Sequence, residues 1–179
     1  TFEDTMIYLV LASALFYYME IYLVWNIGDD VKTGKIVLDL IKPMDYQLYT
    51  FCNVTGNLIV SLLTTFIPTM IIVDVITKGA IPLGWNLLWF FLSIIFSAVI
   101  NFFVEFFVGT ICIHTQSVWG INILKVMLVS LLSGATIPIA FFPDFLQKVV
   151  GYLPFQAMYN IPLNLLIKSN LSVETIVKY

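Results

Sequence analysis

The chain has 179 residues, of which 60% are hydrophobic and only 11% are charged, and its mean hydropathy is +0.99. A water-soluble domain of this length cannot bury so large an apolar fraction, so the composition indicates a membrane protein. The formal net charge is -3 and all eight basic residues are lysines, which excludes the clustered basic surface that nucleic-acid binding requires.

Four apolar stretches are long enough to cross a bilayer, whose hydrocarbon core of about 30 Å needs roughly 20 helical residues. We expect helices because every backbone N–H and C=O in lipid must be hydrogen-bonded within the protein. The apolar residues also run continuously instead of alternating, which excludes the strands of a β-barrel. The predicted spans are Met6–Ile27, Leu48–Ile76, Trp85–Cys112 and Val118–Phe141.

A polar stretch, Gly28–Gln47, separates the first two spans and contains three lysines and four aspartates. Short cytoplasmic loops are enriched in positive charge, so we place this stretch in the cytoplasm. That orientation puts Thr77–Gly84 and Phe142–Asn170 outside, and it puts the short turn His114–Ser117 inside.

Within the polar stretch the pattern predicts a short amphipathic helix, Lys35–Lys42. Gly34 allows a break before it, whereas Pro43 cannot continue a helix and disfavours helical geometry at the preceding residue. Such a helix can lie on the membrane surface or dock into a groove of another protein. Its apolar stripe consists of four residues at helical spacing: Val37, Leu40, Ile41 and Met44. A charged pair, Lys35 and Asp39, lies one turn apart on another face.

Four charged residues fall inside or near the ends of the spans, where charge is costly and often marks a transport path. We expect structural roles for Asp74, one turn before Lys78, and for Lys125, which can extend to the inner surface. Glu20 and Glu105 lie deeper, and the sequence offers no partner for either. They are candidate intramembrane polar sites, and a proton relay through them leaves an ion-gradient-driven carrier or channel open as an alternative.

The segment Phe142–Asn170 is apolar but contains Pro143, Pro154 and Pro162, each of which breaks or kinks a helix. No unbroken run is long enough to cross, so we predict two short helices that enter the membrane and return. The first is Asp144–Val150, ended by Gly151. The second presents one apolar face: Phe155, Tyr159, Leu163, Leu166 and Ile167.

Signals for catalysis or metal binding are weak. His114 is the only histidine, and on a short turn near Ser117 we expect it to be solvated. Cys52 and Cys112 lack metal-ligand spacing and are expected to pack in the interior. We therefore expect no catalytic residue and no metal site. Two glycines beside small polar residues predict close helix contacts: Gly56 and Gly134.

A phosphate-binding loop for ATP is also missing from the sequence. Such a loop requires Gly-x-x-x-x-Gly-Lys followed by Ser or Thr, whereas Gly34-Lys35 is followed by Ile36 and has Asp29 at the position of the first glycine. Energy for active transport would therefore come from a separate ATPase or from an ion gradient, and we expect no cofactor bound by this chain.

The order and spacing of several segments relative to the helices carry a resemblance that covers most of the chain. These segments are Trp25–Ile36, Leu40–Gln47, Ser133-Gly134 before Ile137-Pro138, Phe141–Pro143, and Leu153–Phe155 before Pro162. In these features the chain resembles the membrane-spanning permease subunits of ABC-2 type ATP-binding cassette transporters, and within them the bacterial ABC-2 family transporter proteins.

The resemblance implies an all-α polytopic permease with a cytoplasmic coupling helix, bound by an ATPase subunit, and an outer re-entrant hairpin that caps the translocation path. It implies one permease domain over residues 1–179, lacking the first helix and most of the last helix of a six-helix subunit. It also implies export from a bacterial plasma membrane, a second permease subunit, identical or related, and ATP and Mg bound in the ATPase subunits. The implied ATPase-coupling residues are Lys35, Val37, Asp39, Leu40, Ile41 and Lys42.

Overall fold

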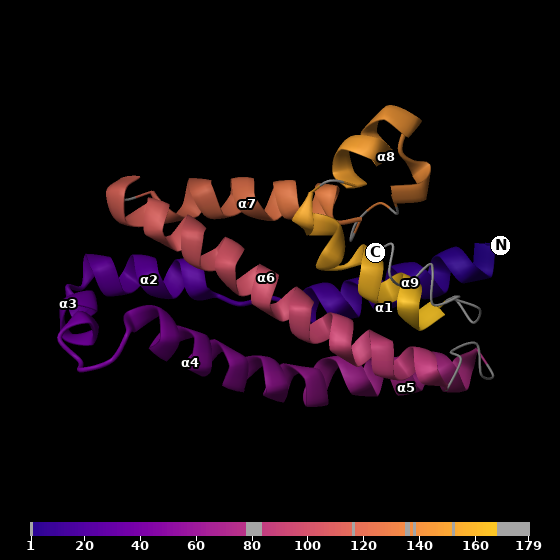
Figure 1. Ribbon diagram of the computed structural model, residues 1–179, viewed down its shortest axis with the longest axis horizontal. Helices are drawn as coiled ribbons and strands as arrows, with labels where there is room; N and C mark the ends of the chain where they lie inside the picture. The colour runs from indigo at the N-terminus through magenta and orange to yellow at the C-terminus, as the bar shows by residue number, and fades with distance from the viewer. Residues whose placement is uncertain are drawn as a thin grey trace.

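The computed structural model describes residues 2–77, 84–115, 117–134, 137, 139–151 and 153–167, and the regular elements in these ranges are all helices (Figure 1). The α-helices are α1 Phe2–Tyr18, α2 Leu23–Lys32, α3 Lys35–Leu40, α4 Tyr46–Ser61, α5 Ile67–Ile76, α6 Trp85–Thr115, α7 Val118–Leu132, α8 Asp144–Gly151 and α9 Asn160–Ile167. Three helical stretches are long and apolar enough to cross a membrane: Met6–Lys32, Tyr46–Ile76 and Leu87–Thr115. The all-α membrane architecture is therefore confirmed.

The first span differs from the prediction because it is not one continuous helix. α1 ends at Tyr18 and α2 begins at Leu23, so Met19–Tyr22 form a break inside the span. α2 also continues to Lys32, five residues beyond the predicted end at Ile27. No glycine or proline marks the break, and tertiary contacts described below hold it.

The second span runs as predicted and contains a short π-helical segment, Leu62–Phe66, between α4 and α5. Pro68 lies at the start of α5 and accounts for the π-helical geometry of the preceding segment. A proline has no N–H to donate, and its ring clashes with the carbonyl four residues earlier, so the preceding turn widens.

The fourth predicted span is shorter than expected. α7 ends at Leu132 and not at Phe141, because Gly134 turns the chain with a φ of 77°. Its 15 residues cover about 22 Å at 1.5 Å per residue, less than the hydrocarbon core. A 3-10 turn, Ile139–Phe141, then leads to the outer segment.

The outer segment contains the first predicted short helix as α8. The second predicted helix is divided into a 3-10 turn, Pro154–Ala157, and α9. Tyr159, Leu163 and Leu166 of its predicted apolar face are buried. Figure 1 places α8 in the half of the molecule away from α3, and it places the end of α6 and the start of α7 at the same end as α3. This arrangement agrees with the predicted alternation of the loops.

α6 is the central helix of the fold, because α2, α4, α7 and α9 all pack against it. Aromatic rings fill much of this core. Phe66 of the π-helical segment stacks on Phe90 of α6 at a centroid distance of 5.5 Å, and Phe51 of α4 meets Phe102 of α6 edge-on at 5.0 Å. These four rings join the second span to α6 at two places, one on α4 and one on the π-helical segment.

Two glycines permit the close approach of α2 to its neighbours. A Cβ atom at Gly28 would clash with the Val118 side chain of α7, and a Cβ at Gly109 of α6 would lie 2.6 Å from Ile27 Cδ1. The predicted contact glycines are different. Gly56 has no neighbouring atom within 4 Å of its Cβ position, and Gly134 lies against Ile139 in the turn after α7.

We expect Gly28→Leu to lower the free energy of unfolding by about 1–3 kcal/mol, because overpacking at Val118 would push α2 away from α7. Thermal unfolding in lipid nanodiscs measures the effect. Gly56→Leu is the matched control, since the space around Gly56 is open and its stability should stay at or above that of the native chain. Equal stability of the two variants would contradict the packing described here.

Candidate functional site

The polar stretch between the first two spans forms a loop built around α3. Gly34 precedes α3 with a φ of 75°, a left-handed conformation that a side chain disfavours, and this turn ends α2 and redirects the chain. The Asp29 carbonyl accepts hydrogen bonds from both the Thr33 N–H, at 2.9 Å, and the Thr33 hydroxyl, at 2.7 Å. The predicted helix is therefore present, although it ends at Leu40, two residues before its predicted end.

Two lysines tie this loop to the helices on either side. Lys35 Nζ lies 3.1 Å from the carboxylate of Asp30 on α2. Lys42 Nζ lies 2.7 Å from the Asp39 carboxylate and 4.3 Å from the ring centroid of Tyr49 on α4. The hydrogen bonds to Asp30 and Asp39 raise the pKa values of Lys35 and Lys42 respectively, so both lysines are charged at neutral pH. The loop is thus joined to both α2 and α4.

The apolar side chains of the loop remain exposed. No residue of α3 is buried, and Ile41, just after it, is 73% exposed. An apolar cluster of this kind on a polar loop is typical of a contact surface for another protein or for lipid. Leu38 is also exposed, as are all four residues of the predicted stripe, two of which lie beyond the end of α3: Val37, Leu40, Ile41 and Met44.

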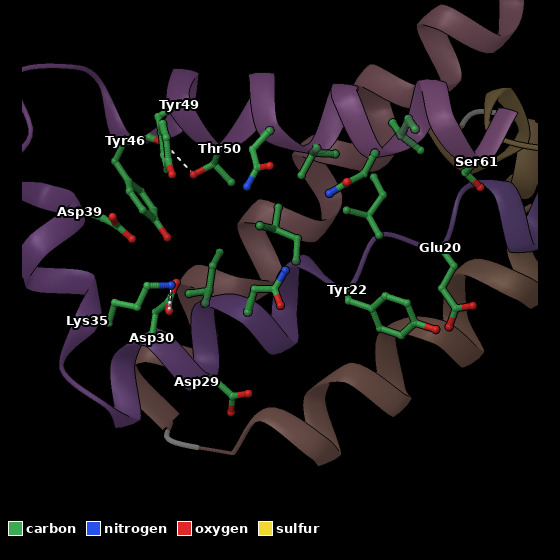
Figure 2. A pocket seen from close by; sticks show the side chains of 18 of the residues that line it. Glu20, Tyr22, Asp29, Asp30, Lys35, Asp39, Tyr46, Tyr49, Thr50 and Ser61 are labelled. Atoms are coloured by element: carbon green, nitrogen blue, oxygen red, sulfur yellow. Dashed lines mark hydrogen bonds and ion pairs between the residues drawn. The ribbon is translucent and has the colours of Figure 1, made fainter. Parts of the chain in front are cut away.

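A cleft of about 580 Å³ lies between α2 and α4, and α3 closes one end of it. Figure 2 shows the Lys35–Asp30 pair at one end of the cleft and Glu20 at the other. The walls combine polar and apolar side chains, and Asn26 on α2 and Asn53 and Asn57 on α4 are among the polar residues of the lining. The volume falls in the range typical of small-molecule sites.

A polar stripe on α6 supports the break in the first span. Asn101 Nδ2 donates to the Met19 carbonyl at 2.6 Å, and Ser97 Oγ donates to the Ala157 carbonyl at 2.6 Å. Ser97, Asn101 and Glu105 follow one another at four-residue spacing and are all buried. The sequence analysis missed Ser97 and Asn101, although this spacing in an apolar helix was the signal that could have identified them.

The two candidate glutamates have different surroundings. Glu105 is 5% exposed and forms an ion pair with Lys125 of α7, so the expectations of an unpartnered Glu105 and of a Lys125 that extends to the inner surface are both wrong. Glu20 is exposed in the break and lines the cleft. The structure thus separates the two glutamates into a buried ion pair and an exposed carboxylate.

The remaining candidates do not form a catalytic group. His114 is exposed, as predicted, although it lies in the last turn of α6 and not on a loop, whereas the nearby Cys112 is buried. Cys52 is exposed on α4 and so is not the interior residue that the sequence indicated. Within the described part of the chain, no group of three histidine, cysteine or acidic side chains is placed to hold a metal ion.

Comparison with known proteins identifies a family. The family model described as "ABC-2 family transporter protein" matches residues 1–179. The chain matches none of the curated proteins and none of the solved structures with which it was compared.

We expect Lys125→Met to lower the free energy of unfolding by about 3–5 kcal/mol, because it leaves the buried Glu105 carboxylate without its ion partner. Adding Glu105→Gln should recover most of that loss, since no buried charge then remains. Unfolding in nanodiscs measures both variants. Lys148→Met on the exposed face of α8 is the control and should be neutral. A double variant as unstable as Lys125→Met would contradict this account of the pair.

Proposed function

We propose, since the chain belongs to the ABC-2 family of transporter proteins, that ATP binding and hydrolysis in a separate ATPase subunit drive this permease. The ATPase subunit would bind the permease at α3. The observation that carries the proposal is the exposed apolar stripe on α3 and the turn after it. Burial of these side chains in a groove of a soluble partner would be favourable at about 25 cal/mol per Å² of apolar surface.

The two ends of the α3 loop suit it to transmit motion. Lys35 joins the loop to α2 through Asp30, and Lys42 joins it to α4 through the Tyr49 ring. These helices form the two walls of the cleft. Displacement of α3 by a partner would therefore act on both walls and change the width of the cleft, which is the movement that alternating access requires.

The wider assembly follows from the same proposal. The permease would work as a dimer with an identical or related subunit and two ATPase subunits that hold ATP and Mg. Export across a bacterial plasma membrane is the proposed direction and location. The short helix α8 and the buried α9 would cap the path in the half of the molecule away from α3.

The ion-gradient alternative is the weaker proposal. A proton relay needs carboxylates that exchange protons with water, whereas Glu105 is buried and engaged in an ion pair with Lys125. Glu20 alone would then have to carry the relay.

We expect Leu40→Ser with Ile41→Ser to reduce association with the ATPase at least tenfold, because each large apolar side chain fully buried at an interface contributes roughly 1.5–3 kcal/mol. The measurement is the amount of ATP-binding cassette subunit that co-purifies with the permease from its native host, together with the ATPase activity of the complex. Insertion of the variant into the membrane should be unchanged.

Phe145→Ser with Leu146→Ser is the matched control, since these apolar residues are exposed on α8 in the half of the molecule away from α3. This variant should retain the ATPase. Undiminished co-purification with the α3 variant would refute the assignment of α3 as the coupling helix. Uphill transport by the permease without any nucleotide would favour the ion-gradient alternative.

A further inference from the structure

The break in the first span, Met19–Tyr22, has a sequence that is compatible with a helix. The segment contains no glycine or proline, and Met19 and Glu20 are good helix formers. A helix through this segment would give each N–H an acceptor four residues earlier, which satisfies the backbone locally inside a membrane. The sequence of the segment therefore does not cause the break.

The broken backbone leaves polar groups of this segment without helical partners. Among the residues that the structure describes, neither the Ile21 N–H nor the Tyr22 N–H donates a backbone hydrogen bond. A continuous helix would pair these two groups with the carbonyls of Tyr17 and Tyr18. The broken state thus gives up local hydrogen bonds that the same sequence is able to form.

Two side chains of α6 compensate on either side of the break. Asn101 Nδ2 donates to the Met19 carbonyl at 2.6 Å, and the Glu105 carboxylate accepts a hydrogen bond from the Val24 N–H near the start of α2. Glu105 is also paired with Lys125 of α7, so the start of α2 is anchored to both α6 and α7. The end of α1, in contrast, is held to α6 by Asn101.

The break also determines how the cleft is lined. Glu20, Ile21 and Tyr22 all line it, although consecutive residues of a helix point about 100° apart. A continuous helix could not direct all three side chains into one cleft. Conversion of the segment to a helix would therefore change the cleft at the end where Figure 2 shows Glu20 and Tyr22.

We propose that Met19–Tyr22 is a two-state switch, broken in this structure and helical in a second state, with Asn101 as the latch of the broken state. Release of the Met19 carbonyl would let α1 continue into α2, while Glu105 keeps α2 on α6 and α7. A partner or ligand that favours one of two such states shifts the population toward it. Asn101 is a positioning residue in this scheme, which concerns the permease alone and does not depend on what drives it.

Asn101→Leu tests the latch, because it nearly preserves the size of the side chain and removes the donor. In lipid nanodiscs without nucleotide or ATPase, we expect the Ile21 and Tyr22 amides to exchange hydrogen for deuterium at least tenfold more slowly than in the native chain, since the helical state gives them acceptors. Hydrogen-exchange mass spectrometry of peptides that cover the break measures these rates. Loss of a merely structural hydrogen bond would loosen the segment and speed exchange, so faster or unchanged exchange would overturn the proposal.

Tyr22→Pro separates helix formation from other sources of protection. Tyr22 has a φ of -70°, which suits proline, and its side chain is 59% exposed. The broken state should therefore accept proline, whereas the helical state cannot, because the ring would clash with the Tyr18 carbonyl. In the double variant Asn101→Leu with Tyr22→Pro, the Ile21 amide should return to its native exchange rate. Slow exchange that persists in the double variant would rule out the helical state.

Ser97→Ala is the matched control, since Ser97 belongs to the same polar stripe of α6 but donates to the Ala157 carbonyl of the outer segment. Its exchange rate at Ile21 should equal that of the native chain. Asn101→Ala removes the same donor, has the same expected result as Asn101→Leu, and takes its place if the leucine variant does not fold. Equal slowing in Ser97→Ala would assign the effect to the whole stripe and overturn the role of Asn101.

Discussion

The hydrogen bond from Asn101 to the Met19 carbonyl meets the constraint on which this fold depends, namely that backbone polar groups inside a membrane need partners within the protein. A continuous helix meets that need locally. The first span does not, because Met19–Tyr22 leave the helical path. α6 compensates with a buried polar stripe in an otherwise apolar helix, and the ion pair of Glu105 with Lys125 fixes the same stripe to α7. The contact with α6 therefore stabilises the break in the first span.

The break also gives the molecule its polar interior. The interruption brings Glu20 and Tyr22 into the lining of the cleft. Irregular backbone in a membrane is tolerated where it is buried in protein or lines a cavity, and this segment meets that condition.

Much of the fold follows from the sequence, since length and apolarity fix the spans, and Gly34 and Pro43 bound the region of α3. The break could not be predicted, because Tyr18–Tyr22 contain no helix-breaking residue and the stabilising partner lies 82 residues away in the chain. The same limit hid the ion pair of Glu105, whose partner depends on the register between α6 and α7. Of the candidate site, the exposed stripe was predictable from helical periodicity, whereas the cleft arises only when α2 and α4 are placed side by side.

Unequal packing of the two cleft walls decides which of them can move. α2 packs closely on α6 and α7, through the contacts of Gly28 with Val118 and of Gly109 with Ile27, so these three helices form one closely packed unit. α4 contacts α6 over a smaller part of its length, and the cleft separates it from α2. A force applied at α3 would therefore shift α4 relative to this unit more readily than it would deform the unit itself. The π-helical segment Leu62–Phe66 joins α4 to α5 and interrupts the regular α-helical geometry of that span. A shift of α4 would therefore be accommodated by bending at this segment.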